Sequence, residues 1–172
     1  MGFLVTVGLA GAGSSEVRKR YLPKGFSSNY MMTIGAEIVD RKMNVRDRSI
    51  LFQIWDLAGS PRTVRTVYFY GRVGFLVFYK KNDRDSFRDV PRWFERFKKH
   101  NGKPIRLFSK DNFALIAINE EPEVVTKEEG VNLAERLGMN YYEFDLINVE
   151  QMNEILYKIG EWYLDRIPAT KG

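Results

Sequence analysis

A glycine-rich segment near the amino terminus carries residue types that could bind phosphate. An apolar run over residues 3–7 leads into Gly8, and a helical pattern follows from Ser15. A strand, a glycine turn and a helix N-terminus form an anion site, because free backbone N–H groups and the helix dipole converge there. Phosphate loops have the pattern G-x-x-x-x-G-K-[ST]. Gly8 and Gly13 match its spacing and Ser15 stands at the Mg²⁺-binding hydroxyl, but Ser14 replaces the lysine.

Two interpretations of this loop stay open. The loop is either a working phosphate site or a tight turn that serves only strand–helix packing. The missing lysine favours the turn, because backbone amides alone bind anions weakly.

Two further polar residues follow predicted strands. Asp56 ends an apolar run and precedes Gly59 by three residues, so its carboxylate could face a Mg²⁺–phosphate group while the Gly59 N–H approaches it. Asn119 follows another predicted strand. It could contact a ligand there, or it could hold the glycine loop by hydrogen bonds. Asp56 is a Mg²⁺ ligand only if the loop binds a nucleotide.

Composition narrows the class of protein. The 172 residues predict a single domain, residues 1–172, with a formal charge of +5. No apolar run approaches the roughly 20 residues of a membrane helix, and no secretory signal is present, so we expect a cytoplasmic protein. The sequence has no cysteine and one histidine, His100, which argues against disulfides, a prenyl anchor and histidine-based catalysis. Gly2 fits a loose myristoylation pattern, but we expect it to begin the first strand.

The order of apolar patterns predicts the architecture. Strands are expected over residues 3–7, 34–45, 49–55, 74–79, 113–118 and 141–145, and helices over 15–22, 83–99, 126–137 and 149–166. Residues 24–33 are expected to form a polar loop, and residues 61–70 a loop that becomes a helix. Thr126 and Glu129 predict a capping box at the start of the 126–137 helix, with Gly138 as its stop. Alternating strands and helices predict an α/β three-layer sandwich around a six-stranded, mainly parallel sheet with one antiparallel edge strand. The first helix is expected to be basic on its exposed side, with Arg18, Lys19 and Arg20. Ligands bind at the carboxyl ends of such strands, where the glycine loop, Asp56 and Asn119 fall.

Three motifs carry a resemblance to a known family. Residues 26–35 (FSSNYMMTIG), 52–59 (FQIWDLAG) and 83–87 (DRDSF) resemble segments of the Ras superfamily of small GTPases, closest to its Rab-like branch. The resemblance covers residues 3–164 and implies a P-loop G domain that binds GTP or GDP with Mg²⁺, in signalling or trafficking. It implies nucleotide contacts at Gly8, Ala10, Gly11, Ala12, Gly13, Ser14, Ser15, Phe26, Thr33, Gly59 and Asn119, and Mg²⁺ ligands at Ser15, Thr33 and Asp56.

The sequence departs from the family pattern at residues that bind the nucleotide or orient the attacking water. Ser14 replaces the phosphate-binding lysine, which costs about 1.5–3 kcal/mol or more. Ser60 replaces the glutamine that orients water, so no catalytic residue is identified. Glu120 and Pro122 replace the lysine and aspartate that contact guanine. Arg18, Lys19, Arg62 or Arg65 could supply a substitute cation.

These features predict a pseudoGTPase that binds nucleotide weakly or not at all. Its work would be protein–protein interaction through a switch surface of Ile34, Ile38, Trp55 and Tyr68. The alternatives are a divergent GTP/GDP switch with a substitute cation, or a scaffold that docks on a true GTPase. The basic segment 98–106 predicts a solvated loop, or contact with an acidic partner or membrane surface, and no nucleic-acid platform is indicated.

Overall fold

The computed structural model describes residues 2–22, 28–31 and 35–168, and for 28–31 only the backbone. Its elements follow one another along the chain as strands that alternate with helices. They are β1 (Phe3–Gly11), α1 (Ser14–Tyr21), β2 (Ser28–Met31), β3 (Ala36–Val45), β4 (Arg48–Leu57), η2 (Thr66–Phe69), β5 (Gly74–Lys80), α2 (Arg84–His100), η3 (Ile105–Leu107), η4 (Lys110–Asn112), β6 (Phe113–Ile118), α3 (Lys127–Leu137), β7 (Asn140–Phe144) and α4 (Gln151–Leu164).

One sheet runs through the molecule in the order β2-β3-β4-β1-β5-β6-β7. The pairs from β4 to β7 are parallel, and β3 is antiparallel to β4. This confirms the predicted mainly parallel sheet with an antiparallel edge. The four-residue β2 lies beyond β3 as a short additional strand, where the sequence predicted a loop.

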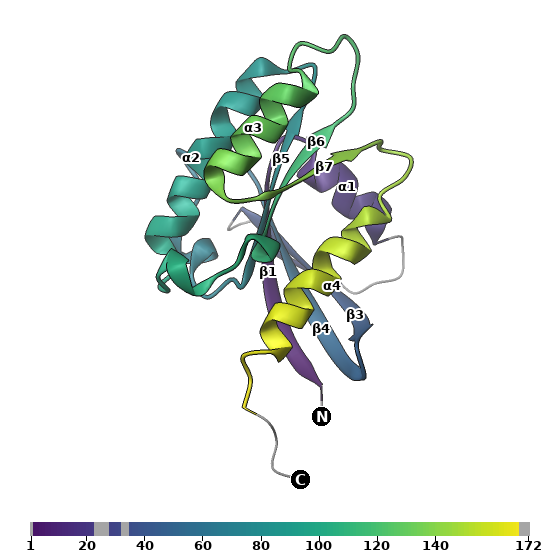
Figure 1. Cartoon of the computed structure of the whole chain (residues 1–172), viewed down its shortest axis with the longest axis vertical. Coiled ribbons are helices and arrows are strands. Elements are labelled where there is room, and N and C mark those ends of the chain that lie inside the picture. The colour runs from purple at the N-terminus through teal and green to yellow at the C-terminus, as the bar shows by residue number, and fades with distance from the viewer. Residues whose placement is uncertain (1, 23–27, 32–34, 169–172) are drawn as a thin grey trace.

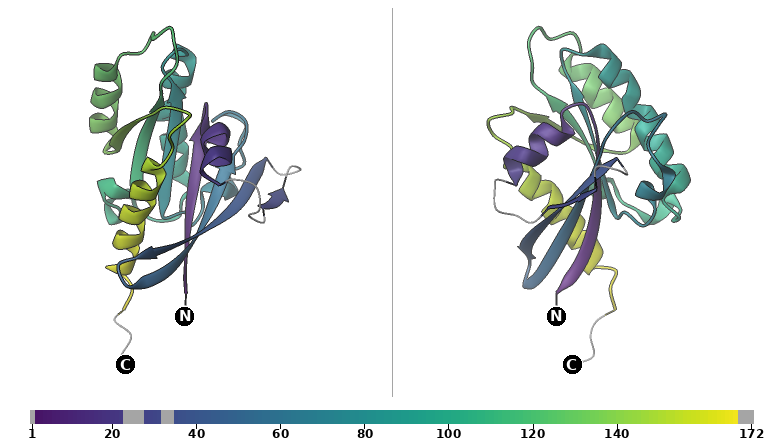
Figure 2. Two further views of the ribbon diagram at one scale, coloured as in Figure 1. Left: turned by 90° about the vertical axis from the view of Figure 1, so that its right-hand side faces the viewer. Right: turned by 180° about the vertical axis from the view of Figure 1, so that it is seen from behind.

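Helices cover both faces of the sheet, as Figures 1 and 2 show. One face packs against α1 and α4 through a cluster that includes Val17, Phe52 and Ile159. The other face packs against α2 and α3 through a cluster that includes Phe75, Trp93 and Leu133. The predicted three-layer sandwich is therefore confirmed, with an apolar core on each side of the sheet.

Local signals placed several elements well. The strand predicted over 113–118 is β6 with the same bounds, and all six of its residues are buried. Thr126 and Glu129 form the predicted capping box of α3, and Gly138 ends that helix in the left-handed conformation. Residues 61–70 were predicted as a loop that becomes a helix. A loop does lead into a helix there, but the helix is only the short 3-10 turn η2.

The ligand site was predicted at the carboxyl ends of β1, β4 and β6. β1 ends at Gly11, β4 at Leu57 beside Asp56, and β6 at Ile118 just before Asn119. Among the described residues, no helix has the length and apolar character that crossing a bilayer requires.

Candidate nucleotide site

The glycine loop is shorter than its sequence suggests, because β1 runs through most of it. Gly8 to Gly11 pair in parallel with β5, in register from Gly8 opposite Phe75 to Gly11 opposite Phe78. Gly11 has φ +98°, and a Cβ there would lie 2.1 Å from the Phe78 carbonyl oxygen. Only Ala12 and Gly13 separate the strand from α1, so little of the loop is free to wrap around a phosphate.

Asp56 is the centre of a buried hydrogen-bond cluster. Its Oδ1 accepts from the Ser14 hydroxyl at 2.8 Å, and its Oδ2 accepts from the Ser15 hydroxyl at 2.8 Å. Arg18 Nε donates to the same Oδ2 at 2.8 Å. Ser14 and Asp56 are both buried, so the serine at the lysine position serves as an internal donor to Asp56.

Arg18 also bridges to a second carboxylate. Its Nη2 lies 2.6 Å from Glu37 Oε2. Glu37 stands opposite Asp56 in the β3–β4 ladder, so the hairpin register puts two carboxylates side by side. Like charges at this spacing repel, and a guanidinium offers enough donors to bind both at once. The prediction that Arg18 lies on the exposed side of α1 is therefore wrong: its side chain is only 6% exposed, whereas Lys19 and Arg20 are exposed as predicted.

This arrangement does not fit a Mg²⁺ ion beside Asp56. A cation bound between Ser15 and Asp56 would adjoin the Arg18 guanidinium, which already neutralises that carboxylate. Thr33, the other expected ligand, lies outside the described residues. Among the residues that are described, no group of three or more His, Cys, Asp or Glu side chains is placed to hold a metal.

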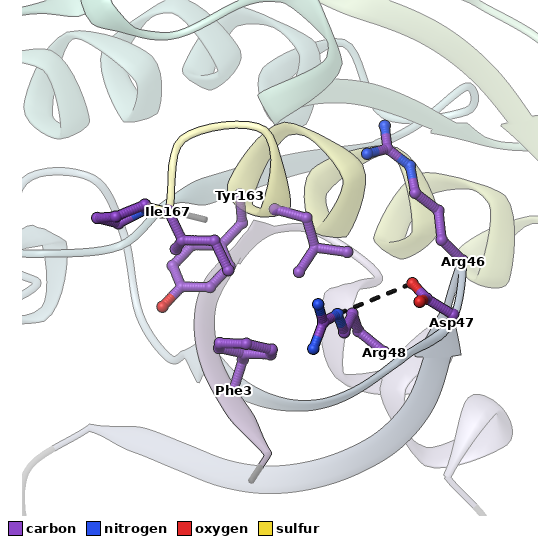
Figure 3. A pocket seen from close by; sticks show the side chains of 8 residues that line it. Phe3, Arg46, Asp47, Arg48, Tyr163 and Ile167 are labelled. Atoms are coloured by element: carbon purple, nitrogen blue, oxygen red, sulfur yellow. Dashed lines mark ion pairs between the residues drawn. The ribbon is translucent and has the colours of Figure 1, made fainter. Parts of the chain in front are cut away.

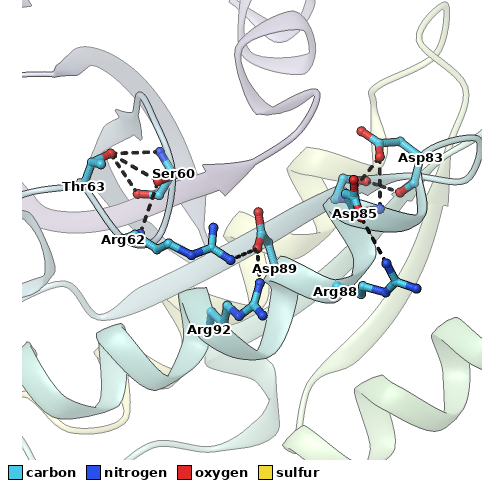
Figure 4. A network of polar contacts seen from close by, with 9 residues as sticks. Ser60, Arg62, Thr63, Asp83, Asp85, Arg88, Asp89 and Arg92 are labelled. Carbon is cyan, nitrogen blue, oxygen red and sulfur yellow. Dashed lines mark hydrogen bonds and ion pairs between the residues drawn. The ribbon is translucent and has the colours of Figure 1, made fainter.

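A hollow of about 260 Å³ adjoins the glycine loop on its other side, and its walls are acidic. Gly11, Gly59 and Ser60 line one wall, and Asp83, Asp85 and Asp89 line the other. Figure 4 shows Asp89 between the Ser60 turn and the end of α2 that carries Asp83 and Asp85. These carboxylates are already engaged, because Asp85 and Asp89 pair with arginines and Asp83 caps α2. A phosphate placed here would have to compete with them for the same donors.

Ser60 and the nearby arginines are also engaged within the chain. The Ser60 hydroxyl lies 3.2 Å from the Thr63 hydroxyl and accepts from the Arg62 N–H at 3.3 Å (Figure 4). The Arg62 guanidinium pairs with Asp89 at 3.6 Å. Of the four cations considered as substitutes for the lysine, Arg18 lies in the site, and it is committed to carboxylates.

The residues on the side expected to hold the base make polar contacts with one another. Asn119 Nδ2 donates to Asp145 Oδ1 at 2.8 Å rather than to the glycine loop. Glu120 accepts from Asn82 at 3.0 Å and pairs with Lys80 at 3.6 Å, and Lys80 also contacts Glu16 at 3.1 Å. Lys80 thus links α1 to the segment after β6. Phe26, expected against the base, lies outside the described residues.

The residues expected to contact a partner are largely covered. Ile38 and Tyr68 are 7% and 3% exposed. Trp55 is half-buried, with the Arg72 guanidinium 3.7 Å from its ring centroid and the Tyr68 ring at 6.2 Å. Burial lowers the pKa of Arg72 to about 10. Ile34 lies outside the described residues, so Trp55 is the partly accessible member of this set.

The structure therefore brings together Ser14, Ser15 and Asp56. It adds Glu37, which the sequence reasoning did not assign to the site, and it buries Arg18, which that reasoning named only as a possible substitute cation. The register of the β3–β4 hairpin could have identified these residues. It sets Glu37 opposite Asp56, and two adjacent carboxylates require a cation nearby.

A separate hollow of about 650 Å³ lies at the opposite end of β1 (Figure 3). Phe3, Tyr163 and Ile167 form its apolar wall, and Arg48, which lies 3.8 Å from Asp47, stands at its edge. Ligands of parallel sheets bind at the carboxyl ends of the strands, so this hollow is remote from the candidate site.

Comparison with known proteins places the chain in one family. Residues 3–164 match the family model described as Ras family. The chain is 26% identical over 170 residues to Ras-related protein SEC4 of Saccharomyces cerevisiae, across 98% of this chain and 77% of that protein. It is 30% identical over 166 residues to Ras-related protein Rab-3C of Bos taurus, across 91% and 70%. It is 32% identical over 158 residues to Ras-related protein RABA5e of Arabidopsis thaliana, across 89% and 71%.

Proposed function

The chain belongs to the Ras family, in its Rab-like branch, and we propose that it is a pseudoGTPase. In this proposal it binds GTP and GDP weakly or not at all, hydrolyses GTP negligibly, and acts as a protein-interaction module in the cytoplasm.

The observation that carries the proposal is the position of Arg18. Its guanidinium lies 2.8 Å from Asp56 and 2.6 Å from Glu37, with its side chain 6% exposed. A cation of the chain itself therefore occupies the place where the family would bring a metal ion to Asp56. Because the carboxylate is already neutralised, a nucleotide–Mg²⁺ complex would have to displace a buried ion pair in order to bind.

The sequence substitutions act in the same direction. Ser14 supplies no charge to a phosphate and donates its hydroxyl to Asp56. Ser60 is too short to orient an attacking water in the manner of the family's glutamine. Pro122 offers no side-chain acceptor to guanine. Losses at the phosphate and at the base are independent, so their free-energy costs add.

The interaction surface in this proposal centres on Trp55, with Ile34, Ile38 and Tyr68 around it. Since Ile38 and Tyr68 are buried in the isolated chain, a partner would first meet Trp55 and Arg72. A large aromatic under an arginine is typical of interface anchors. A related GTPase that docks on this face would make the protein a scaffold.

One observation favours a second candidate function, a divergent nucleotide switch. The Ser15 hydroxyl and Asp56 lie 2.8 Å apart, which keeps together the pair that the family uses near Mg²⁺. In this alternative Arg18 leaves Asp56 when nucleotide arrives and contacts a phosphate. Thr33→Ala would then abolish Mg²⁺-dependent binding.

Calorimetric titration of the nucleotide-stripped protein with GTP and GDP, with and without Mg²⁺, tests the proposal. We expect no heat at high-micromolar nucleotide and no phosphate release in a turnover assay. Arg18→Met, which frees Asp56, should gain detectable Mg²⁺-dependent binding, and Lys19→Met, on the exposed side of the same helix, should not. Tight Mg²⁺-dependent binding by the unmodified protein would refute the pseudoGTPase and support the switch.

A further inference from the structure

The outer face of α2 carries a row of arginines that the nucleotide fold does not use. Arg84, Arg88, Arg92 and Arg96 follow one another at helical spacing, and Arg62 and Arg136 flank them from the preceding loop and from α3. Two hollows run along this face, of about 470 and 580 Å³, and they meet at Pro91 and Arg92. Together they make one groove, which we call the arginine groove.

The floor of the groove is apolar. Phe87, Pro91 and Leu133 line it between α2 and α3. The two helices lie side by side in Figure 1, and Arg84 joins them through its ion pair with Glu129. A ligand in the groove would therefore meet apolar contacts below and guanidinium groups at the sides. The lining also includes one carboxylate, that of Glu95, which pairs with Lys98 at 3.3 Å.

The cations of the groove are only weakly committed. Arg88 pairs with Asp85 at 3.2 Å and Arg92 with Asp89 at 2.8 Å, each within one helical turn, and both arginines are more than half exposed. Figure 4 shows Arg62 and Arg92 directed at Asp89, and Arg88 directed at Asp85. Exposed pairs of this kind contribute about 0–1 kcal/mol, so they exchange readily for another carboxylate. Arg136 has no hydrogen-bond or ion-pair partner among the described residues.

Two arginines of the set are structural by contrast. Arg96 donates to the Val64 carbonyl at 2.6 Å, and Arg84 holds Glu129 at the start of α3. Arg88, Arg92 and Arg136 are therefore the side chains that are most available to a partner, and Arg62 shares the Asp89 carboxylate with Arg92.

We infer that the arginine groove binds an acidic, extended segment of a partner protein. The distance from Arg84 to Arg96 along the helix is about 18 Å, which an extended peptide spans in about six residues. Guanidinium groups bind carboxylates through paired N–H donors, and the apolar floor suits one or two aliphatic side chains of such a segment. The groove lies outside the Ser14–Asp56 cluster, so it would serve this partner whether or not nucleotide binds.

The inference is tested with the full chain and a fluorescein-labelled peptide of about eight residues, composed of glutamates with two leucines. Fluorescence anisotropy at low ionic strength should show saturable binding that weakens as salt is added. A peptide with glutamine at each glutamate position should not bind.

A pair of variants separates the groove from net charge. Arg88→Gln with Arg92→Gln should weaken binding by about tenfold or more, since two charge-assisted contacts are lost. Lys19→Gln with Arg20→Gln removes the same charge from α1, on the opposite face of the sheet, and should change affinity by less than about twofold. Circular dichroism melting checks that both variants stay folded.

Three results would overturn the inference. They are the absence of binding by the unmodified protein, an equal loss of affinity in the α1 variant, and vesicles with anionic lipid that bind through Arg88 and Arg92 in preference to the peptide. The last result would assign the groove to a membrane surface. None of them depends on nucleotide binding, so they leave the pseudoGTPase proposal untouched.

Discussion

Replacing Arg18 by methionine tests the central ion pair most directly. The two side chains are 6% and 2% exposed, so Arg18→Met would leave the Asp56 carboxylate buried without its cation. Removing one partner of a buried pair destabilises a protein by about 3–5 kcal/mol. Ser14 and Ser15 still donate to Asp56, which offsets part of the loss, so we expect about 3 kcal/mol.

Urea denaturation at neutral pH, without nucleotide or metal, measures this loss. For a chain of this length, a loss of about 3 kcal/mol corresponds to a melting temperature lower by about 6–12 °C. Lys19→Met is the matched control, because Lys19 is exposed on the same helix and should change stability by less than about 0.5 kcal/mol.

A double variant completes the test. Arg18→Met combined with Asp56→Asn removes both charges, so it should be less destabilised than the sum of the two single variants. If Arg18→Met behaves like Lys19→Met, the ion pair does not form in solution. The proposal that Arg18 takes the place of a metal ion at Asp56 then fails as well.

Two further predictions concern the backbone at Gly11 and the loss of stability at low pH. Gly11→Ala should cost at least about 2 kcal/mol more than Gly71→Ala in urea unfolding, because both glycines have positive φ but only Gly11 has a carbonyl oxygen 2.1 Å from the added Cβ; equal losses would refute the tight β1–β5 approach. The hydrogen bond from Arg84 lowers the pKa of Glu129 from 4.5 to about 2. The stability from this pair should therefore be complete above pH 4.5 and lost as the pH falls through about 2. An NMR titration should place the Glu129 midpoint near the lower value and move it upward in Arg84→Gln, and an unchanged midpoint in that variant would contradict the assignment.

Elements with a local signal could be predicted from the sequence. β6 consists of six apolar residues and is buried along its whole length, and the Thr126–Glu129 capping box needs only residues three apart. The mainly parallel sheet between two helical layers followed from the alternation of strands and helices. These features depend on residues that lie close together in the sequence, so the sequence alone is enough to predict them.

The interior of the site could not be predicted in the same way. The helical pattern of α1 put Arg18 among exposed basic residues, but its burial depends on Glu37 and Asp56, which lie far along the chain. The extension of β1 through Gly11 likewise depends on pairing with β5. Tyr68 was expected at the surface, yet it packs beside Trp55 because η2 folds back on the sheet.

The Arg18 cluster makes residues 14 and 18 epistatic. Ser14 reaches Asp56 from the same backbone position at which the family has its lysine. A lysine introduced at position 14 alone would bring a second cation to a carboxylate that Arg18 already neutralises, and it would also remove a hydroxyl donor. We therefore expect a lysine at position 14 to be tolerated only when residue 18 is uncharged. The order in which the two substitutions are made then decides whether the intermediate protein is stable.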